Sequence, residues 1–444
     1  MGRASTIARV REVIRPTLSG QQQAGPEASN AEHAYLYGIR GVLTISSILW
    51  IFFQTFLPTL VTDETTGPFY QKVLRIVLAP IFWNESLISS FFFVLSGRSI
   101  CVRFLKEPKG TAFAGSVIRR IVRLGLAAGI ASGIASGIMK ALGSDYVHDF
   151  KVALPNMSIA TPKLADDGLV AVNAMFDMFW VVRSYYYQAA NKFWPSNTIW
   201  NVSLIYQQSW TIYFLMVILP FTRASWHKTF LLIFSVGSFW MCSWGWYDAS
   251  ALLLADYVTS SALRPRLDEG LTIKGDWKVP YALAAAGMVL VGFAQKFCWA
   301  VFPQYIDREL LLHPFLDLSE NETRASFAAA DPYPRVDNWF IIFGLLLMIE
   351  TTTQARNVLS AKWLVAIGKR SLSIFIAMSL VFWTAGIKLF LHLHTRLGTG
   401  LALSNLAVFV TCTAATFVTA EVYYRTIDLG TQWLARETFS WLLR

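Results

Sequence analysis

The chain has 444 residues, of which 55% are hydrophobic and 15% are charged, and its mean hydropathy is +0.44. Soluble domains carry about 25% charged residues, so this composition excludes an ordinary soluble protein and indicates one surrounded by membrane lipid. The net charge of +10 does not indicate nucleic-acid binding, because the basic residues stand mostly in short connections between apolar runs. We therefore expect membrane lipid, and no nucleic acid, as a partner.

Residues 1–34 are polar, rich in Gln, Ser and Arg, and contain no apolar stretch of the kind found in a cleavable signal. We expect a disordered cytosolic tail here. The segment "STIARVREVIRPTL" leaves open a weak basic amphipathic helix on a membrane surface.

Apolar runs of nearly the length of a membrane span follow one another through the rest of the chain. A spanning helix needs about 20 mostly apolar residues. The runs occupy residues 37–60, 82–104, 117–142, 203–221, 229–244, 247–260, 279–302, 339–354, 364–389 and 401–423. They predict an all-α, polytopic transmembrane helical bundle of roughly ten spans, with residues 35–425 forming one membrane domain.

Basic residues are concentrated in alternate connections, and cytoplasmic loops carry such an excess of Lys and Arg. This pattern places both termini in the cytosol. The glycosylation sequons at Asn156 and Asn321 then fall on the lumenal side, where they could be used. We expect a multi-pass protein of the secretory pathway or the plasma membrane.

Three segments have other expected roles. Residues 146–200 form a long lumenal excursion whose aromatic stretch predicts an interfacial helix or lid, and residues 426–444 predict an amphipathic helix on the cytosolic face. Gly129, Gly133 and Gly137, spaced by four residues in the third run, predict a strip against which another helix packs closely.

Several arginines lie in or beside one end of the first three runs. Charges within membrane spans are costly and are functional candidates by default. Guanidinium groups bind phosphate bidentately, so a group of them suits a nucleotide or a lipid headgroup. The candidate anion-binding residues are Arg40, Arg98, Arg119, Arg120 and Arg123. The alternatives are anchors that reach the membrane surface, or partners of the acidic residues Asp256, Glu350 and Glu421.

No metal site is expected from the cysteines and histidines. Cys101, Cys242, Cys298 and Cys412 all lie in or beside apolar runs, as reduced packing residues do. His392 and His394 form an isolated H-x-H pair in a predicted loop, and none of the six histidines lies in a predicted membrane core.

Several motifs occur in an order that resembles a known family. They are "YLYGIRGVLTISSILWIFF", "FFFVLSG", "SVIRRIVRLG", "WYDASALLLADYV", "SAKWLVAIGKRSLSIFIAM" and "AEVYYRTIDLGTQWLAR". In this order they resemble the acyltransferase 3 family of integral-membrane acyltransferases, and the last resembles its fungal members.

The resemblance implies a ten-helix fold that takes an acyl group, commonly acetyl, from cytosolic acyl-CoA as co-substrate. It implies delivery to a hydroxyl on a sugar, a lipid or a small molecule. By the same resemblance, Arg40, Arg119, Arg120 and Arg123 would hold the phosphates of coenzyme A.

The chain departs from the family at the positions of its catalytic residues. The histidine that the family places eleven residues after its first arginine corresponds to Ile51, a glutamate corresponds to about Ile205, and a second histidine corresponds to Met378. Acyl transfer to an alcohol needs a base within hydrogen-bond reach, which Ile and Met cannot supply. Glu85, in "WNESL", is the remaining candidate base, and its alternative is a solvated charge at a loop end.

Two other functions remain open. One is a catalytically inactive member of the family that binds acyl-CoA or an anionic lipid. The other is a transporter of a lipid or small molecule, in which intramembrane arginines guide a headgroup. Tyr206, Gln207 and Gln208 could contact an acceptor or make interhelical hydrogen bonds.

Overall fold

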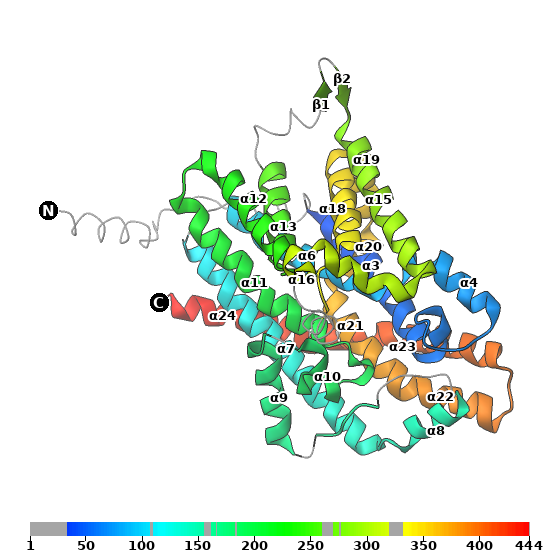
Figure 1. Ribbon diagram of the computed structural model, residues 1–444. Coiled ribbons are helices and arrows are strands. Elements are labelled where there is room, and N and C mark those ends of the chain that lie inside the picture. Colours follow the sequence, from blue (N-terminus) through cyan, green and yellow to red (C-terminus); the bar gives the residue numbers. More distant parts are fainter. Residues whose placement is uncertain are drawn as a thin grey trace.

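The apolar runs form helices that pack into one bundle (Figure 1). The computed structural model describes residues 33–106, 110–154, 161–165, 167–182, 184–259, 270–274, 277–318 and 332–443. Asn156, Asn321 and residues 1–32 of the expected N-terminal tail lie outside this part of the chain.

The helices of the first half begin with α3 (Ala34–Phe56), which is followed by two short helices and two long ones. They are α4 (Phe69–Val77), α5 (Ala79–Phe82), α6 (Glu85–Lys106) and α7 (Gly110–Leu142). Three short helices come next: α8 (Asp145–Ala153), α9 (Gly168–Trp180) and α10 (Ala189–Phe193). Then follow α11 (Trp200–Ile218), α12 (Ala224–Trp240) and α13 (Gly245–Thr259).

The second half begins with an antiparallel hairpin of β1 (Leu271–Lys274) and β2 (Trp277–Val279), in which Leu271 is paired with Val279. The helices after it are α15 (Tyr281–Val301), the 3₁₀ segment η5 (Pro303–Leu312), α16 (Pro314–Asp317), α18 (Val336–Thr351) and α19 (Thr353–Leu359). The last are α20 (Lys362–Lys369), α21 (Ser371–Val381), α22 (Ile387–Leu391), α23 (Leu401–Tyr423) and α24 (Leu429–Leu442).

Local chemistry explains where several helices begin and end. The Asn84 side chain accepts a hydrogen bond from the Leu87 amide at 2.9 Å and thereby caps α6, and Asp167 caps α9 through the Val170 amide at 2.8 Å. Proline, which has no backbone N–H, follows the end of α3 at Pro58 and the end of α15 at Pro303.

Within the described residues, six helices are long and apolar enough to cross a membrane, and the bent pair α18–α19 adds a seventh. The expected number of roughly ten spans is therefore not confirmed. The predicted runs 203–221, 229–244 and 247–260 form α11, α12 and α13, of 19, 17 and 15 residues, which do not meet the same test. The run 339–354 ends at a bend of 104° between α18 and α19.

Helix α3 lies between two parts of the hydrophobic core. Its C-terminal half packs against α21, α22 and α23 through aromatic rings, with 4.9 Å between the ring centroids of Phe52 and Phe409. Its N-terminal half packs with α6, α13 and α18. Both ends of α3 are therefore held in place by long-range contacts.

The segment expected as an excursion folds into α8, α9 and α10 at one end of the bundle, and the β1–β2 hairpin lies at the other end (Figure 1). The predicted close packing of the glycine strip of α7 holds at Gly129, where a Cβ atom would lie 2.2 Å from Cε of Met175 in α9, but not at the other two glycines. A Cβ atom at Gly133 or Gly137 would meet nothing within 4 Å among the described residues, because these glycines line an open cavity of about 370 Å³.

Candidate functional site

A cavity of about 440 Å³ lies between α3, α6, α7, α11 and α21. Four of the five candidate arginines line it: Arg40, Arg119, Arg120 and Arg123. None of the described lining residues is Asp or Glu, and the other polar groups come from Tyr37, Ser96, Ser99, Ser116, Asn201, Tyr213 and Ser371. We refer to it below as the arginine cavity.

Neutral oxygen atoms hold Arg40 and Arg120 in place. Arg40 Nη2 donates to Ser99 Oγ at 2.8 Å and to the Leu95 carbonyl at 3.2 Å. Arg120 Nη2 donates to Ser96 Oγ at 2.7 Å and to the Ile205 carbonyl at 2.9 Å. Because these acceptors are uncharged, they orient the guanidinium groups without neutralising them.

The other two arginines contact the C-terminal helix. Arg119 Nε donates to the Gly115 carbonyl at 2.7 Å, and its guanidinium carbon lies 5.4 Å from the ring centroid of Phe439. Arg123 Nε lies 3.4 Å from Asp428 Oδ1. Helix α24, which the sequence predicts as an amphipathic tail, thus packs beside the arginines of α7.

Arg98 does not line the arginine cavity. It is 1% exposed and forms a buried ion pair with Glu350, whose Oε1 also accepts a hydrogen bond from the Tyr35 hydroxyl at 2.5 Å. Its assignment to the anion site is therefore corrected, and the alternative of pairing with an acidic residue holds for Arg98. Glu421 likewise pairs with Arg370 and Arg425.

A smaller cavity of about 20 Å³ adjoins the arginine cavity and is lined by Glu85. The two cavities have Asn201 and Phe375 in common as lining residues. Trp50 and Asn201 are 5% and 8% exposed. Trp50 Nε1 and Asn201 Oδ1 have no hydrogen-bond partner among the described residues. A carboxylate and two unused polar atoms thus surround a space that fits one water molecule or one hydroxyl group.

The residues at the positions where the resemblance would expect catalytic side chains carry no acid–base group. Ile51 and Met378 are both 0% exposed and belong to the same hydrophobic cluster as Phe52 and Phe382. Ile205 lines the arginine cavity and holds Arg120 through its backbone carbonyl. Of the candidate acceptor contacts, Gln207 instead joins helices, with Nε2 donating to the Val181 carbonyl at 2.5 Å.

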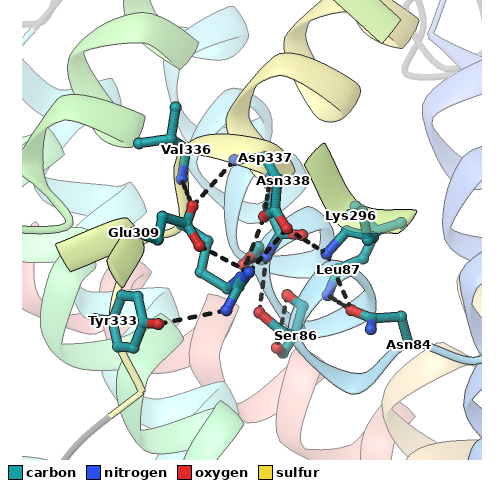
Figure 2. Close-up of polar contacts among 12 residues, drawn as sticks. Asn84, Ser86, Leu87, Lys296, Glu309, Tyr333, Val336, Asp337 and Asn338 are labelled. Atoms are coloured by element: carbon teal, nitrogen blue, oxygen red, sulfur yellow. Dashed lines mark hydrogen bonds and ion pairs between the residues drawn. The ribbon is translucent and has the colours of Figure 1, made fainter. Parts of the chain in front are cut away.

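The sequence analysis missed a cluster of buried charges at the Asn84 end of α6 (Figure 2). Arg335 donates to both oxygens of Asp337, at 3.1 and 2.9 Å, and its Nη2 lies 2.7 Å from Glu309 Oε2. Lys296 Nζ lies 3.1 Å from Asp337 Oδ2 and 3.3 Å from Asn84 Oδ1. Lys296 stands inside the predicted run 279–302, so its charge was a signal that could have identified the cluster.

Electrostatic effects at this cluster oppose one another. Burial alone would lower the pKa of Arg335, but the carboxylates of Asp337 and Glu309 raise it above its usual range. Burial raises the pKa of Glu309 to about 7, and the nearby Arg335 acts in the opposite direction. These charges therefore depend on one another for their stability in the interior.

Among the described residues, no group of three or more His, Cys, Asp or Glu side chains could hold a metal ion. The four cysteines are free thiols. In the comparisons with known proteins, no protein-family model, no curated protein and no solved structure matches this chain.

Proposed function

We propose that this protein is a membrane-bound acyltransferase that binds acyl-CoA in the arginine cavity and transfers its acyl group, such as acetyl, to a hydroxyl group. The observation that carries this proposal is the set of four arginines around one cavity without an acidic lining residue. Coenzyme A carries three phosphate groups, and guanidinium groups bind phosphate oxygens with paired hydrogen bonds.

The neighbouring Glu85 cavity supplies a place for the acceptor hydroxyl. With the phosphates at the arginines, the thioester would extend toward Asn201 and Phe375, which line both cavities. Trp50 Nε1 and Asn201 Oδ1 offer an unused donor and an unused acceptor at this point. These two groups would orient a hydroxyl beside the Glu85 carboxylate.

The chemistry requires one base. Glu85 would accept the hydroxyl proton while the alcohol oxygen attacks the thioester carbonyl carbon. The carbon–sulfur bond then breaks, and coenzyme A leaves as the thiol after taking up the proton. The products are an ester and free coenzyme A, so atoms and charges balance. By the expected topology, the arginine cavity would open toward the cytosol, where acyl-CoA is found.

A second candidate function is binding of acyl-CoA without transfer. The burial of Ile51 and Met378 in the apolar core favours it, because the family histidines are replaced by side chains that exclude a proton-transferring group there. The two functions share the arginine cavity and differ in whether Glu85 acts as a base.

Both candidate functions require acyl-CoA binding in the arginine cavity. Calorimetry with acetyl-CoA and the purified protein tests this binding. We expect Arg40→Ala and Arg123→Ala each to weaken binding roughly tenfold or more, since each removes one charge-assisted contact. Arg223→Ala is the matched control, because Arg223 is exposed at the start of α12 and does not line the arginine cavity. Absence of binding, or equal affinity in all four proteins, would contradict the proposal.

Turnover distinguishes the two candidates. Release of free coenzyme A thiol from acetyl-CoA would be followed with glycerol, glucose and cholesterol as acceptor probes. We expect Glu85→Gln to abolish release while leaving the acetyl-CoA affinity within about twofold, because the amide cannot take up a proton. Binding without release in the native protein would favour the second candidate.

A further inference from the structure

A further cavity, of about 170 Å³, lies beside the buried charge cluster. Figure 2 shows the cluster itself. The cavity is bounded by α4, α5, the start of α6 and the end of α15, and it has no lining residue in common with the arginine cavity or the Glu85 cavity. Its charged lining residues are Asp63, Arg75, Lys296, Arg335 and Asp337. A water molecule occupies only about 10–15 Å³ on this scale, so the space holds a small molecule or chemical group.

Asp337, the buried carboxylate that lines this cavity, has no free acceptor position left for a ligand. Asp337 accepts four hydrogen bonds, from two nitrogens of Arg335, from Lys296 and from the Asn338 amide. Glu309 does not line the cavity; its Oε1 accepts from the Val336 and Asp337 amides, and its Oε2 forms an ion pair with Arg335. A carboxylate offers about four acceptor sites, so Asp337 is saturated.

The basic and aromatic side chains around the same cavity still have N–H groups that are available as hydrogen-bond donors. Lys296 has three N–H donors and contacts only Asp337 and Asn84 among the described residues. Arg75 Nε and Trp299 Nε1 are buried and have no hydrogen-bond partner among the described residues. Arg75 approaches Asp63 only at 3.6 Å, beyond hydrogen-bond distance.

The charges around the cavity also favour an anionic ligand. The side chain of Asp63 is 47% exposed, so water screens its charge, whereas that of Arg75 is only 16% exposed. The three cations Arg75, Lys296 and Arg335 then face two fully buried carboxylates. The unsatisfied donors, together with the mostly buried charge of Arg75, suit an acceptor with negative charge and disfavour a cation.

We propose that this cavity binds a small oxyanion, a carboxylate or a phosphate group, through Arg75, Lys296 and Trp299. The site is independent of the proposed acyl transfer, because no residue of the arginine cavity takes part. The ligand group could come from a free anion or from a lipid headgroup, which offer the same oxygen acceptors.

The test uses the full chain with Arg40→Ala and Arg123→Ala as background, so that phosphate binding to the arginine cavity is weakened. Inorganic phosphate and acetate would be titrated by calorimetry. We expect Arg75→Gln and Trp299→Phe each to weaken binding roughly tenfold, because the first removes a positive charge and the second an N–H donor, and both leave the buried cluster intact. Arg308→Gln is the control, since Arg308 is exposed, stacks on Tyr305 and does not line the cavity.

A second arm distinguishes the two sources. The same proteins would be placed in phosphatidylcholine nanodiscs with and without phosphatidic acid, and their melting temperatures compared. Stabilisation by phosphatidic acid that Arg75→Gln and Trp299→Phe remove identifies a lipid headgroup, and stabilisation by the free anions alone identifies a soluble ligand. If neither arm shows binding, or if binding is equal in Arg75→Gln, Trp299→Phe and the parent, the proposal is wrong.

Discussion

Arg98 and Arg120 show how the immediate surroundings of a guanidinium decide what it can do. Arg98 meets the Glu350 carboxylate, so its charge is compensated within the protein. Among the described residues, Arg120 donates to the hydroxyl of Ser96 and the carbonyl of Ile205. The buried Asp248 carboxyl acts on Arg120 electrostatically without forming an ion pair within 4 Å. A buried ion pair such as that of Arg98 is costly to break, because the remaining charge has no partner. Arg98 therefore links α6 to α18, whereas Arg120 lines the arginine cavity.

His313 provides a prediction about pH at the residue scale. It is 0% exposed, one ring nitrogen contacts the Phe239 carbonyl at 2.6 Å, and burial lowers its pKa below the ordinary 6.5. The unfolded chain then takes up a proton near pH 6.5 and the folded protein does not, so the free energy of unfolding falls as the pH falls through this value. The slope contributed by this residue is at most about 1.4 kcal/mol per pH unit.

Melting temperatures between pH 8 and pH 5 would check this, with His313→Gln as the comparison. The amide stays neutral and can donate to Phe239, so the variant should lose less stability on acidification than the native protein. Glu309, whose raised pKa acts in the opposite direction, is present in both proteins and cancels in the difference. Parallel pH curves for the two proteins would rule out this role for His313.

Part of the candidate site could be predicted from individual residues. Arg119, Arg120 and Arg123 share one side of a helix because residues three and four apart are neighbours there, and the structure places all three at one cavity. Glu350 was one of three acidic residues considered as partners of the arginines, but the sequence could not assign it to Arg98, because the two residues are 252 positions apart. The same holds for Lys296 and Asp337, which belong to different helices and meet only after α15 and α18 have packed.

At the scale of elements, glycine permits the closest helix contact near the site. Helix α3 approaches the end of α19 and α20 closely: a Cβ atom on Gly38 would overlap the carbonyl of Leu359 in α19, and one on Gly368 of α20 would overlap the Tyr37 carbonyl. The sequence analysis placed such contacts on α7, because it read the spacing of small residues and not what lies opposite them. Small residues allow close approach, but the neighbouring helix must be there to use it.

Alanine substitutions can measure the difference between a glycine at a close helix contact and a glycine that lines open space. Gly368→Ala should lower the free energy of unfolding by about 1–3 kcal/mol or more, because a backbone carbonyl cannot move aside as a flexible side chain does. Gly137→Ala is the matched control, since nothing among the described residues lies within 4 Å of its added methyl group. It should leave stability unchanged or raise it slightly through better helix propensity. Similar melting temperatures for the two variants would contradict the close packing of α3 on α20.

The length of apolar runs predicts elements only where a run forms one straight helix. It anticipates α3, α6, α7 and α15, whose runs are long enough to cross a membrane. It fails at α12 and α13, which are helices of 17 and 15 residues, and at the bend after α18, because hydropathy reports composition and not direction. The backbone at Thr352 is extended, and this break is set by tertiary contacts such as those of α19 with α3.

At the scale of the whole molecule, the last helix contacts α7, which carries three of the four arginines of the arginine cavity. Helix α24 packs on α7, and Phe439 covers one side of Arg119. Asp428, which is 0% exposed, lies 3.4 Å from Arg123 and would compete with the proposed anion for that guanidinium. Its other oxygen has no hydrogen-bond partner among the described residues, so burial of this carboxylate lowers the stability of the folded protein. The C-terminal segment therefore has two opposite effects on the arginine cavity.

These two effects can be separated by substitution and truncation. Asp428→Asn removes the competing charge, so acetyl-CoA should bind more tightly, by up to roughly tenfold. Removal of residues 429–444 takes away the packing of α24 and should weaken binding, because Arg119 loses Phe439. A chain ending at residue 440 keeps Phe439 and should bind as the native protein does. If Asp428→Asn weakens binding as much as the longer truncation, Asp428 positions Arg123 for the ligand instead of competing with it.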